Sequence, residues 1–138
     1  MTKFELRIRS ENDILISLRC AGKLMREFEF NEIERQKVLV SISELTRNVL
    51  FHSGTDGLFI CEAEDTLLRI TVSDRGRGIA DHEQVLQGKK NENSKGLGLG
   101  LIGVKRLMDE FHINTSPGEG TTVTVIKYRE PTLAERRL

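Results

Sequence analysis

The chain has 138 residues, the size of one domain, which is enough for a hydrophobic core without disulfides or metals. Basic and acidic residues number 21 each, so no overall field attracts nucleic acid or an acidic membrane, and any charged site must be local. The opening MTKFELRIRS lacks the apolar core of a signal peptide and no run of about eighteen apolar residues occurs, so we expect a cytoplasmic protein that binds neither nucleic acid nor membrane.

The first half of the chain predicts one strand followed by two helices. Apolar and charged residues alternate over residues 4–8, which is the period of a half-buried strand. Apolar residues at helical spacing then predict one helix that ends near Phe28 and another that Gly54 can terminate in the left-handed conformation. Each helix opens with a capping box, formed by Ser10 with Asp13 and by Asn31 with Glu34.

The second half predicts two hairpins separated by a helix. GLFICEA and TLLRITVSD form the first hairpin, and HINTS and TTVTVIKY form the second around the turn PGEG. Between them lie a polar connection with a helical turn at DHEQVLQG and a helix whose apolar positions extend to Phe111. Because helices and strands come in blocks, we expect an α+β two-layer sandwich, with helices on one face of a mixed or antiparallel sheet. Residues 1–130 form this single domain, and residues 131–138 form a frayed tail.

The segment SKGLGLGLIGVKRLMDEF contains the string G-x-G-x-x-G of dinucleotide-binding turns. A dinucleotide turn follows a buried strand, but the preceding QGKKNENSK is polar, and Glu119, at the expected position of the acidic residue, lies in a turn. No Lys-Ser or Lys-Thr pair follows as in a P-loop. The pattern favours a glycine loop that enters a helix and presents free N–H groups to an anion, with a plain linker as the alternative.

Two polar residues of the second predicted helix lie on a face apart from its apolar stripe. Glu44 and Asn48 are four positions apart and therefore share that face. Glu44 offers a base, and Asn48 offers a neutral oxygen of the kind that can suffice for Mg²⁺ when phosphates and water supply the other ligands. The alternative is an ordinary solvated helix face.

A third polar feature, Asp74, ends a strand whose inward residues are apolar, and glycines follow it at 76 and 78. Its carboxylate suits an adenine amino group, and the glycines allow another molecule to approach the backbone. The alternative is an Asx turn that leaves the strand. A tight turn, GEGT, later delivers the hydroxyl of Thr121 to the start of the last hairpin.

Four motifs in this order, ELTRN, DRGRGI, GLGLG and GEGT, resemble the boxes of the GHKL ATP-binding fold shared by gyrase, Hsp90, histidine kinases and MutL. The resemblance covers nearly the whole chain. Within that superfamily the chain resembles the small anti-sigma-factor type serine/threonine kinases, and GVKRLMDEF before the final hairpin looks most like a switch kinase of the stressosome.

The resemblance implies ATP and Mg²⁺ as cofactors. Asp74 would bind the adenine amino group with Thr121 and Gly78 framing the base, Asn48 would bind Mg²⁺, and Glu44 would be the catalytic base. A polar lid over residues 81–95 would cover the nucleotide. Further nucleotide contacts would come from Gly76, Ile79, Lys95, Gly96, Leu97, Gly98, Leu99 and Gly100. The roles of Arg75, Arg77 and His52 stay open.

The implied function is a kinase of a partner-switching stress module. It would phosphorylate a serine or threonine of a STAS-domain antagonist or scaffold protein and then pass to a downstream regulator, which could be a phosphatase, a sensor kinase or a sigma factor. The main alternative is an anti-sigma factor that sequesters a sigma subunit, because both use the same nucleotide site. A histidine-kinase catalytic domain or a stand-alone ATPase fits less well, since neither a phospho-accepting dimerisation helix nor a transducer domain is expected in this chain.

Overall fold

We describe residues 1–76 and 100–137 of a computed structural model of the chain. The elements in chain order are β1 (Thr2–Ile8), α1 (Glu11–Glu27), α2 (Glu32–Asn48), the π-helical turn η1 (Val49–Ser53), β2 (Gly57–Glu64), β3 (Leu67–Asp74), α4 (Gly100–Leu107), β4 (Glu110–Ser116), β5 (Gly120–Tyr128) and α5 (Leu133–Arg136). The predicted turn at DHEQVLQG lies outside the described residues.

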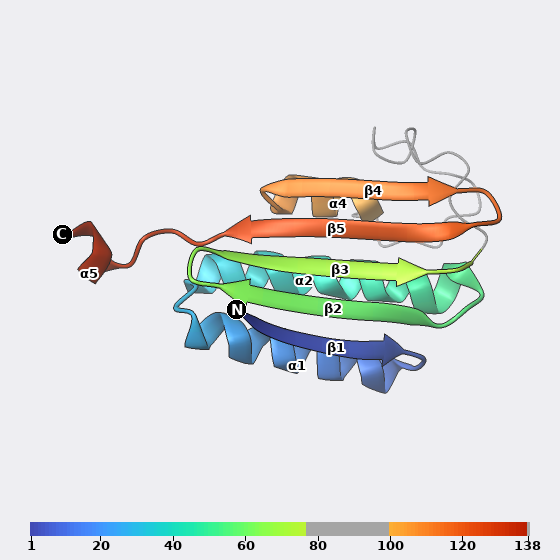
Figure 1. Ribbon diagram of the computed structural model, residues 1–138, viewed down its shortest axis with the longest axis horizontal. Coiled ribbons are helices and arrows are strands. Elements are labelled where there is room, and N and C mark those ends of the chain that lie inside the picture. Colours follow the sequence, from blue (N-terminus) through green and yellow to red (C-terminus); the bar gives the residue numbers. More distant parts are fainter. Residues whose placement is uncertain (77–99, 138) are drawn as a thin grey trace.

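The five strands form one antiparallel sheet in the order β1-β2-β3-β5-β4. Helices α1, α2 and α4 lie on the same face of this sheet (Figure 1). The predicted α+β two-layer sandwich is therefore confirmed, and of the two predicted sheet types the antiparallel one is present.

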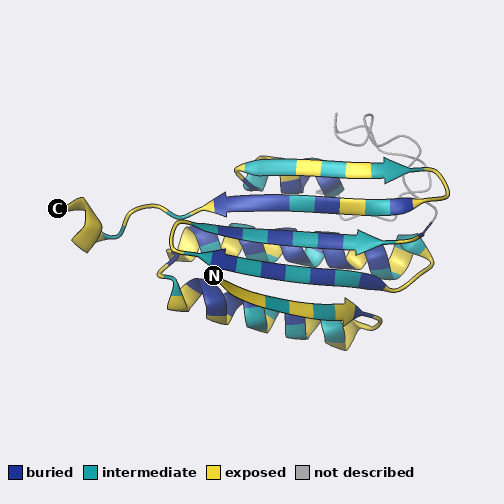
Figure 2. Ribbon diagram, in the orientation of Figure 1, coloured by how far each residue is buried: buried dark blue, intermediate teal, exposed yellow. Residues whose placement is uncertain are grey.

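The core lies between the sheet and the three helices. Along β2 and β3 buried residues alternate with half-buried ones, as expected for a sheet with only one covered face (Figure 2). The covered face and the helices contribute the fully buried side chains, among them Phe59, Leu68, Ile70 and Val125 from the strands and Ile14, Met25, Val38 and Ile42 from α1 and α2. Burial of these apolar side chains is what holds α2 flat against the middle of the sheet.

The capping box that begins α2 also anchors the end of the domain. Asn31 Oδ1 accepts from the Glu34 N–H and Glu34 Oε1 accepts from the Asn31 N–H, both at 2.8 Å. The other oxygen of Glu34 accepts the Glu130 N–H at 2.6 Å, and the Glu34 side chain is buried. One carboxylate thus joins the start of α2 to the segment that follows β5.

The predicted helix through Phe111 is too long, because α4 ends at Leu107 and β4 begins at Glu110. The end of β5 provides the partners that stop the helix. The buried Lys127 ammonium donates to the Leu107 carbonyl at 3.1 Å and to Asp109 Oδ1 at 3.3 Å. Phe111 packs against the core from the strand, so its apolar character is explained equally well by either element.

The chain after β5 contains one element that we did not expect. In residues 131–137, where we expected a frayed tail, the side chain of Thr132 caps the short exposed helix α5. The Arg129 side chain links this segment to the β2–β3 turn by donating to the Asp65 carbonyl at 2.6 Å. Across residues 1–76 and 100–137, no helix has the length and apolar character needed to cross a membrane.

Candidate functional site

Several of the polar residues singled out from the sequence lie at the end of the sheet where β3 finishes and β5 begins. Asp74, the last residue of β3, pairs across the ladder with Thr121 of β5. Helix α2 contacts both of these strands, and the π-helical turn η1 contacts β3. The predicted adenine-binding carboxylate and its hydroxyl partner are therefore brought together on neighbouring strands.

The Asp74 carboxylate is held by the backbone that follows it. Its Oδ1 accepts the Gly76 N–H at 2.8 Å, so the Asx turn considered from the sequence is present. Within residues 1–76 and 100–137 the Asp74 carboxylate forms no other hydrogen bond, and the side chain is half-buried. The turn fixes the direction of the side chain and leaves Oδ2 as an acceptor for a ligand.

The Thr121 hydroxyl is also fixed in place. Its Oγ1 lies 2.8 Å from Oγ1 of Thr115 on β4, and the Thr115 hydroxyl lies 3.2 Å from the Gly120 carbonyl oxygen. Thr115 was not identified from the sequence, since its role depends on the pairing register of β4 with β5, which places it opposite Thr121.

Two glycines allow backbones to approach closely around Asp74. A Cβ on Gly76 would overlap with the Ser53 carbonyl oxygen of η1. A Cβ on Gly120 would overlap with the Asp74 carbonyl oxygen and lie 2.7 Å from the Arg75 Cα, and Gly120 has φ +94°. These contacts lock η1, the end of β3 and the start of β5 together.

The second polar pair lies on α2. Glu44 is buried at 8% exposure, and Asn48, the last residue of α2, is half-buried. Burial raises the pKa of Glu44, and the charge of nearby Arg47 partly opposes this. The alternative of a solvated helix face is therefore wrong for Glu44, which is a carboxylate kept from water with no ion pair among the described residues.

Much of the predicted glycine loop and lid falls in residues 77–99. Gly78, Ile79, Lys95, Gly96, Leu97, Gly98 and Leu99 lie outside the described residues, as does the polar segment 81–95 expected to act as a lid. Gly100 is described and begins α4 with φ +46°. The first N–H groups of a helix have no partner within the helix and lie at its positive dipole end, and both properties favour an anion.

The described groups together suit a nucleotide. They provide an oriented carboxylate and hydroxyl on the sheet, a buried carboxylate and an amide on α2, and the start of α4. Such a set can accept hydrogen bonds from a base, donate to phosphates and receive a proton.

The contact between Gly120 and Asp74 predicts a stability difference between two alanine substitutions in one turn. Gly118 also has a positive φ, +81°, but a Cβ there would have no neighbour within 4 Å. We expect Gly118→Ala to cost about 1 kcal/mol through its backbone conformation and Gly120→Ala about 3 kcal/mol, because a clash is added. Urea unfolding of both variants measures the difference, and equal losses would show that the close approach is unimportant.

Comparison with known proteins gives a consistent assignment. Residues 16–127 match the family described as the histidine kinase-like ATPase domain. The serine/threonine-protein kinase RsbT of Bacillus subtilis is 36% identical over 126 residues, which are 89% of this chain and 94% of RsbT. The anti-sigma F factor of Pasteuria penetrans is 34% identical over 94 residues, covering 62% of this chain and 63% of that protein.

Solved structures agree on the fold. The crystal structure of the RsbU and RsbW domains of Rv1364c from Mycobacterium tuberculosis matches with a TM-score of 0.68 at 17% identity, covering 96% of this chain and 34% of that one. The histidine kinase domain of a blue-light activated histidine kinase from Erythrobacter litoralis matches with a TM-score of 0.52 at 20% identity, covering 83% and 59% of the two chains. The chain therefore belongs to the histidine kinase-like ATPase family, which confirms its resemblance to the GHKL fold and, through RsbT and the anti-sigma F factor, to the small anti-sigma type kinases.

Proposed function

We propose that the chain is an ATP-dependent serine/threonine protein kinase of a partner-switching module. The observation that carries this proposal is Glu44, a buried carboxylate with a raised pKa that lies one helical turn before Asn48. Perturbed carboxylates in such positions are typical of proton-transfer groups. The similarity to the kinase RsbT over nearly the full length of both chains supports the same conclusion.

The adenine of ATP is bound at the end of β3 in this proposal. Asp74 accepts a hydrogen bond from the adenine amino group through the carboxylate oxygen not used in the Asx turn. Thr121, oriented by Thr115, lies beside it. Gly78, which lies outside the described residues, is assigned to the base together with them. The phosphates then extend toward the start of α4 and the glycine segment before it, where backbone N–H groups neutralise their charge.

Asn48 would hold a Mg²⁺ ion in this proposal. Its amide has no recorded hydrogen bond within the described residues, so its oxygen is available as a ligand. No cluster of three or more acidic, histidine or cysteine ligands occurs in residues 1–76 and 100–137. The single amide oxygen of Asn48 suits a Mg²⁺ ion, which commonly takes one or two protein oxygens and completes its shell with phosphates and water. When bound, the ion offsets phosphate charge and helps align the γ-phosphoryl group.

Glu44 receives the proton of the attacking hydroxyl. A serine or threonine Oγ of the partner forms a bond to the γ-phosphorus, the bond from this phosphorus to the bridging oxygen breaks, and ADP leaves with the electron pair. The chain contributes mainly position and charge neutralisation, which is the usual basis of phosphoryl transfer. The raised pKa makes Glu44 a stronger base than an exposed glutamate.

The partners in this proposal are STAS-domain antagonist or scaffold proteins and a downstream regulator. A transferred phosphate adds about two negative charges beside Glu44 and the remaining nucleotide, so the product is repelled and the kinase is released. Sequestration of a sigma factor as the main activity is less favoured, because the anti-sigma F factor matches a smaller part of this chain than RsbT does. Action in the cytoplasm is part of the same proposal.

Substitutions on α2 should separate transfer from nucleotide binding. Glu44→Gln removes the proton acceptor but keeps the shape, so we expect phosphoryl transfer to fall roughly a hundredfold to ten-thousandfold with ATP affinity kept. Asn48→Ala should weaken binding of Mg·ATP itself. Calorimetry measures affinity, and labelled phosphate transferred from ATP to a STAS-domain protein measures the reaction.

The matched control is Glu32→Gln, which changes an exposed carboxylate at the other end of the same helix and should leave both quantities unchanged. Full transfer by Glu44→Gln would remove Glu44 from the role of base. Equal loss of ATP affinity in the Glu44 and Asn48 variants would contradict the proposal that Glu44 serves proton transfer and Asn48 serves nucleotide binding.

The pKa of Glu44 also predicts a pH dependence. A base acts when deprotonated, so the rate is lost as pH falls through its pKa, and because burial raises this pKa the loss occurs at higher pH than for an exposed glutamate. Arg47 lowers the pKa of Glu44, so Arg47→Gln should move the acidic limb of kcat/KM to higher pH. Lys105→Gln on α4 serves as the control and should leave the acidic limb in place. An acidic limb that stays in place or moves to lower pH in Arg47→Gln would contradict the assignment of Glu44 as the base.

A further inference from the structure

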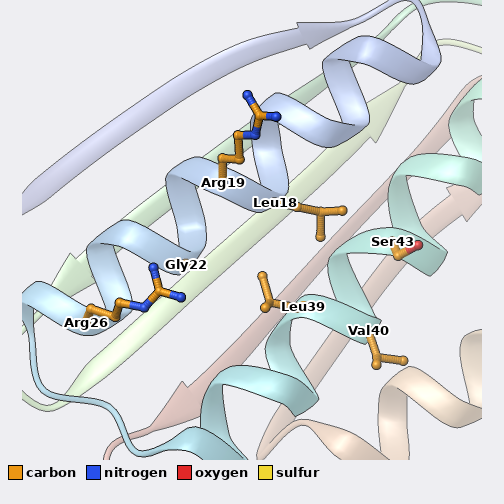
Figure 3. Close-up of a pocket in the computed structure, with 7 residues that line it drawn as sticks. All are labelled: Leu18, Arg19, Gly22, Arg26, Leu39, Val40 and Ser43. Atoms are coloured by element: carbon orange, nitrogen blue, oxygen red, sulfur yellow. The ribbon is translucent and has the colours of Figure 1, made fainter.

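An open groove lies between α1 and α2, on the side of the helices away from the sheet (Figure 3). Its volume is about 540 Å³, and it is lined by Leu18, Arg19, Gly22, Arg26, Leu39, Val40 and Ser43. None of the residues assigned to ATP binding or proton transfer lines it, so the nucleotide site does not account for it.

The groove has an apolar floor that reaches solvent. Leu18 of α1 and Leu39 of α2 point toward one another across the gap (Figure 3). Val40 is 37% exposed, and Leu15, one turn before Leu18, is 54% exposed. Leu18, Leu39 and Val40 thus give the groove apolar lining from two neighbouring helices, which is a surface that a partner can cover.

Gly22 has no explanation inside the molecule. It lies in the interior of α1, where a glycine costs about 1 kcal/mol relative to alanine. A Cβ at this position would meet no atom within 4 Å, so no neighbouring residue requires its absence. The missing side chain instead deepens the groove between Arg19 and Arg26 (Figure 3).

The rim of the groove is basic. Arg19, Lys23 and Arg26 are spaced at four and three residues and therefore follow one side of α1, and all three are exposed. Within the described ranges 1–76 and 100–137, none of them forms an ion pair. Across the groove, Arg47 Nε donates to Ser43 Oγ at 3.1 Å, which places a further cation beside α2. No acidic residue lines the groove.

We propose that this groove binds an acidic amphipathic helix of a partner protein. The apolar ridge of such a helix fits between Leu18 and Leu39, where Gly22 permits close approach, and its Asp and Glu residues pair with the arginines of the rim. A helix is the suitable shape because two adjacent helices form a groove that accepts the side-chain ridge of a third. This docking goes beyond the proposed kinase reaction and does not depend on it.

The experiment uses a synthetic helical peptide as the probe. A labelled 18-residue peptide with leucines at helical spacing and glutamates on both flanks is titrated with the full chain in fluorescence anisotropy, beside a peptide with lysines in place of the glutamates. We expect only the acidic peptide to bind, with affinity that falls as salt is raised. Amide shifts in ¹⁵N spectra should cluster on residues 15–26 and 36–47.

Two groove variants and one control test the assignment. Gly22→Leu places a side chain in the groove whose Cβ meets no atom within 4 Å, and it improves helix propensity, so we expect the fold to be kept while peptide affinity falls at least tenfold. Arg19→Glu with Arg26→Glu should have a similar effect. Arg7→Glu with Lys105→Glu makes the same charge change on β1 and α4, outside the groove, and should bind as the unaltered chain does.

ATP binding is measured on every variant and should not change, so failure of the docking proposal is distinguished from failure of the kinase proposal. Equal binding of the acidic and basic peptides, or an unaltered affinity in Gly22→Leu, would overturn the proposal. Sedimentation of the chain alone tests for a second copy in the groove, and a dimer that Gly22→Leu abolishes would also overturn it.

Discussion

Close packing of three backbone segments at the end of β3 positions the described groups assigned to the nucleotide on the sheet and at the end of α2. Gly76 lies against Ser53 of η1, and Gly120 lies against the Asp74 carbonyl, each at a distance that no side chain would permit. These contacts fix the end of α2 relative to the sheet, because η1 continues directly from Asn48. The candidate site is thus assembled from distant parts of the sequence by contacts between main-chain atoms, and the side chains assigned to it extend from that frame.

Helix α2 contributes to the core, to the candidate site and to the groove with α1, each through a different face. One face, with Val38 and Ile42, is buried in the core, and a second presents Glu44 and Asn48 toward the proposed reaction. The outward face lines the groove with α1 through Leu39, Val40 and Ser43. Arg47 contacts both the candidate site and the groove, because its charge lowers the pKa of Glu44 and its Nε donates to Ser43 Oγ. A partner in the groove would therefore contact the helix that carries the proposed base.

Most of the fold could be predicted from local patterns, because alternation, capping boxes and glycine turns are short-range properties. Local patterns failed at the end of the helix before β4, because Phe111 fits both the spacing of a helix and the alternation of a strand. The long-range contact of Lys127 with the Leu107 carbonyl ends the helix instead. Asp74 and Glu44 were identifiable by residue type and motif. Thr115, Ser53 and the α1–α2 groove were not, because each depends on strand register or on packing between elements that no local pattern records.

Calorimetric titration of ATP into the chain and into Asp74→Asn tests most directly whether the end of β3 is an adenine site. The substitution keeps the shape of the side chain and removes the charge that accepts the adenine amino group. A hydrogen bond to a charged group contributes about 1.5 to 3 kcal/mol, so affinity should fall roughly tenfold to a hundredfold. Unfolding of the variant in urea controls for loss of the Asx turn. ATP affinity that is unchanged in a folded Asp74→Asn protein would contradict the assignment.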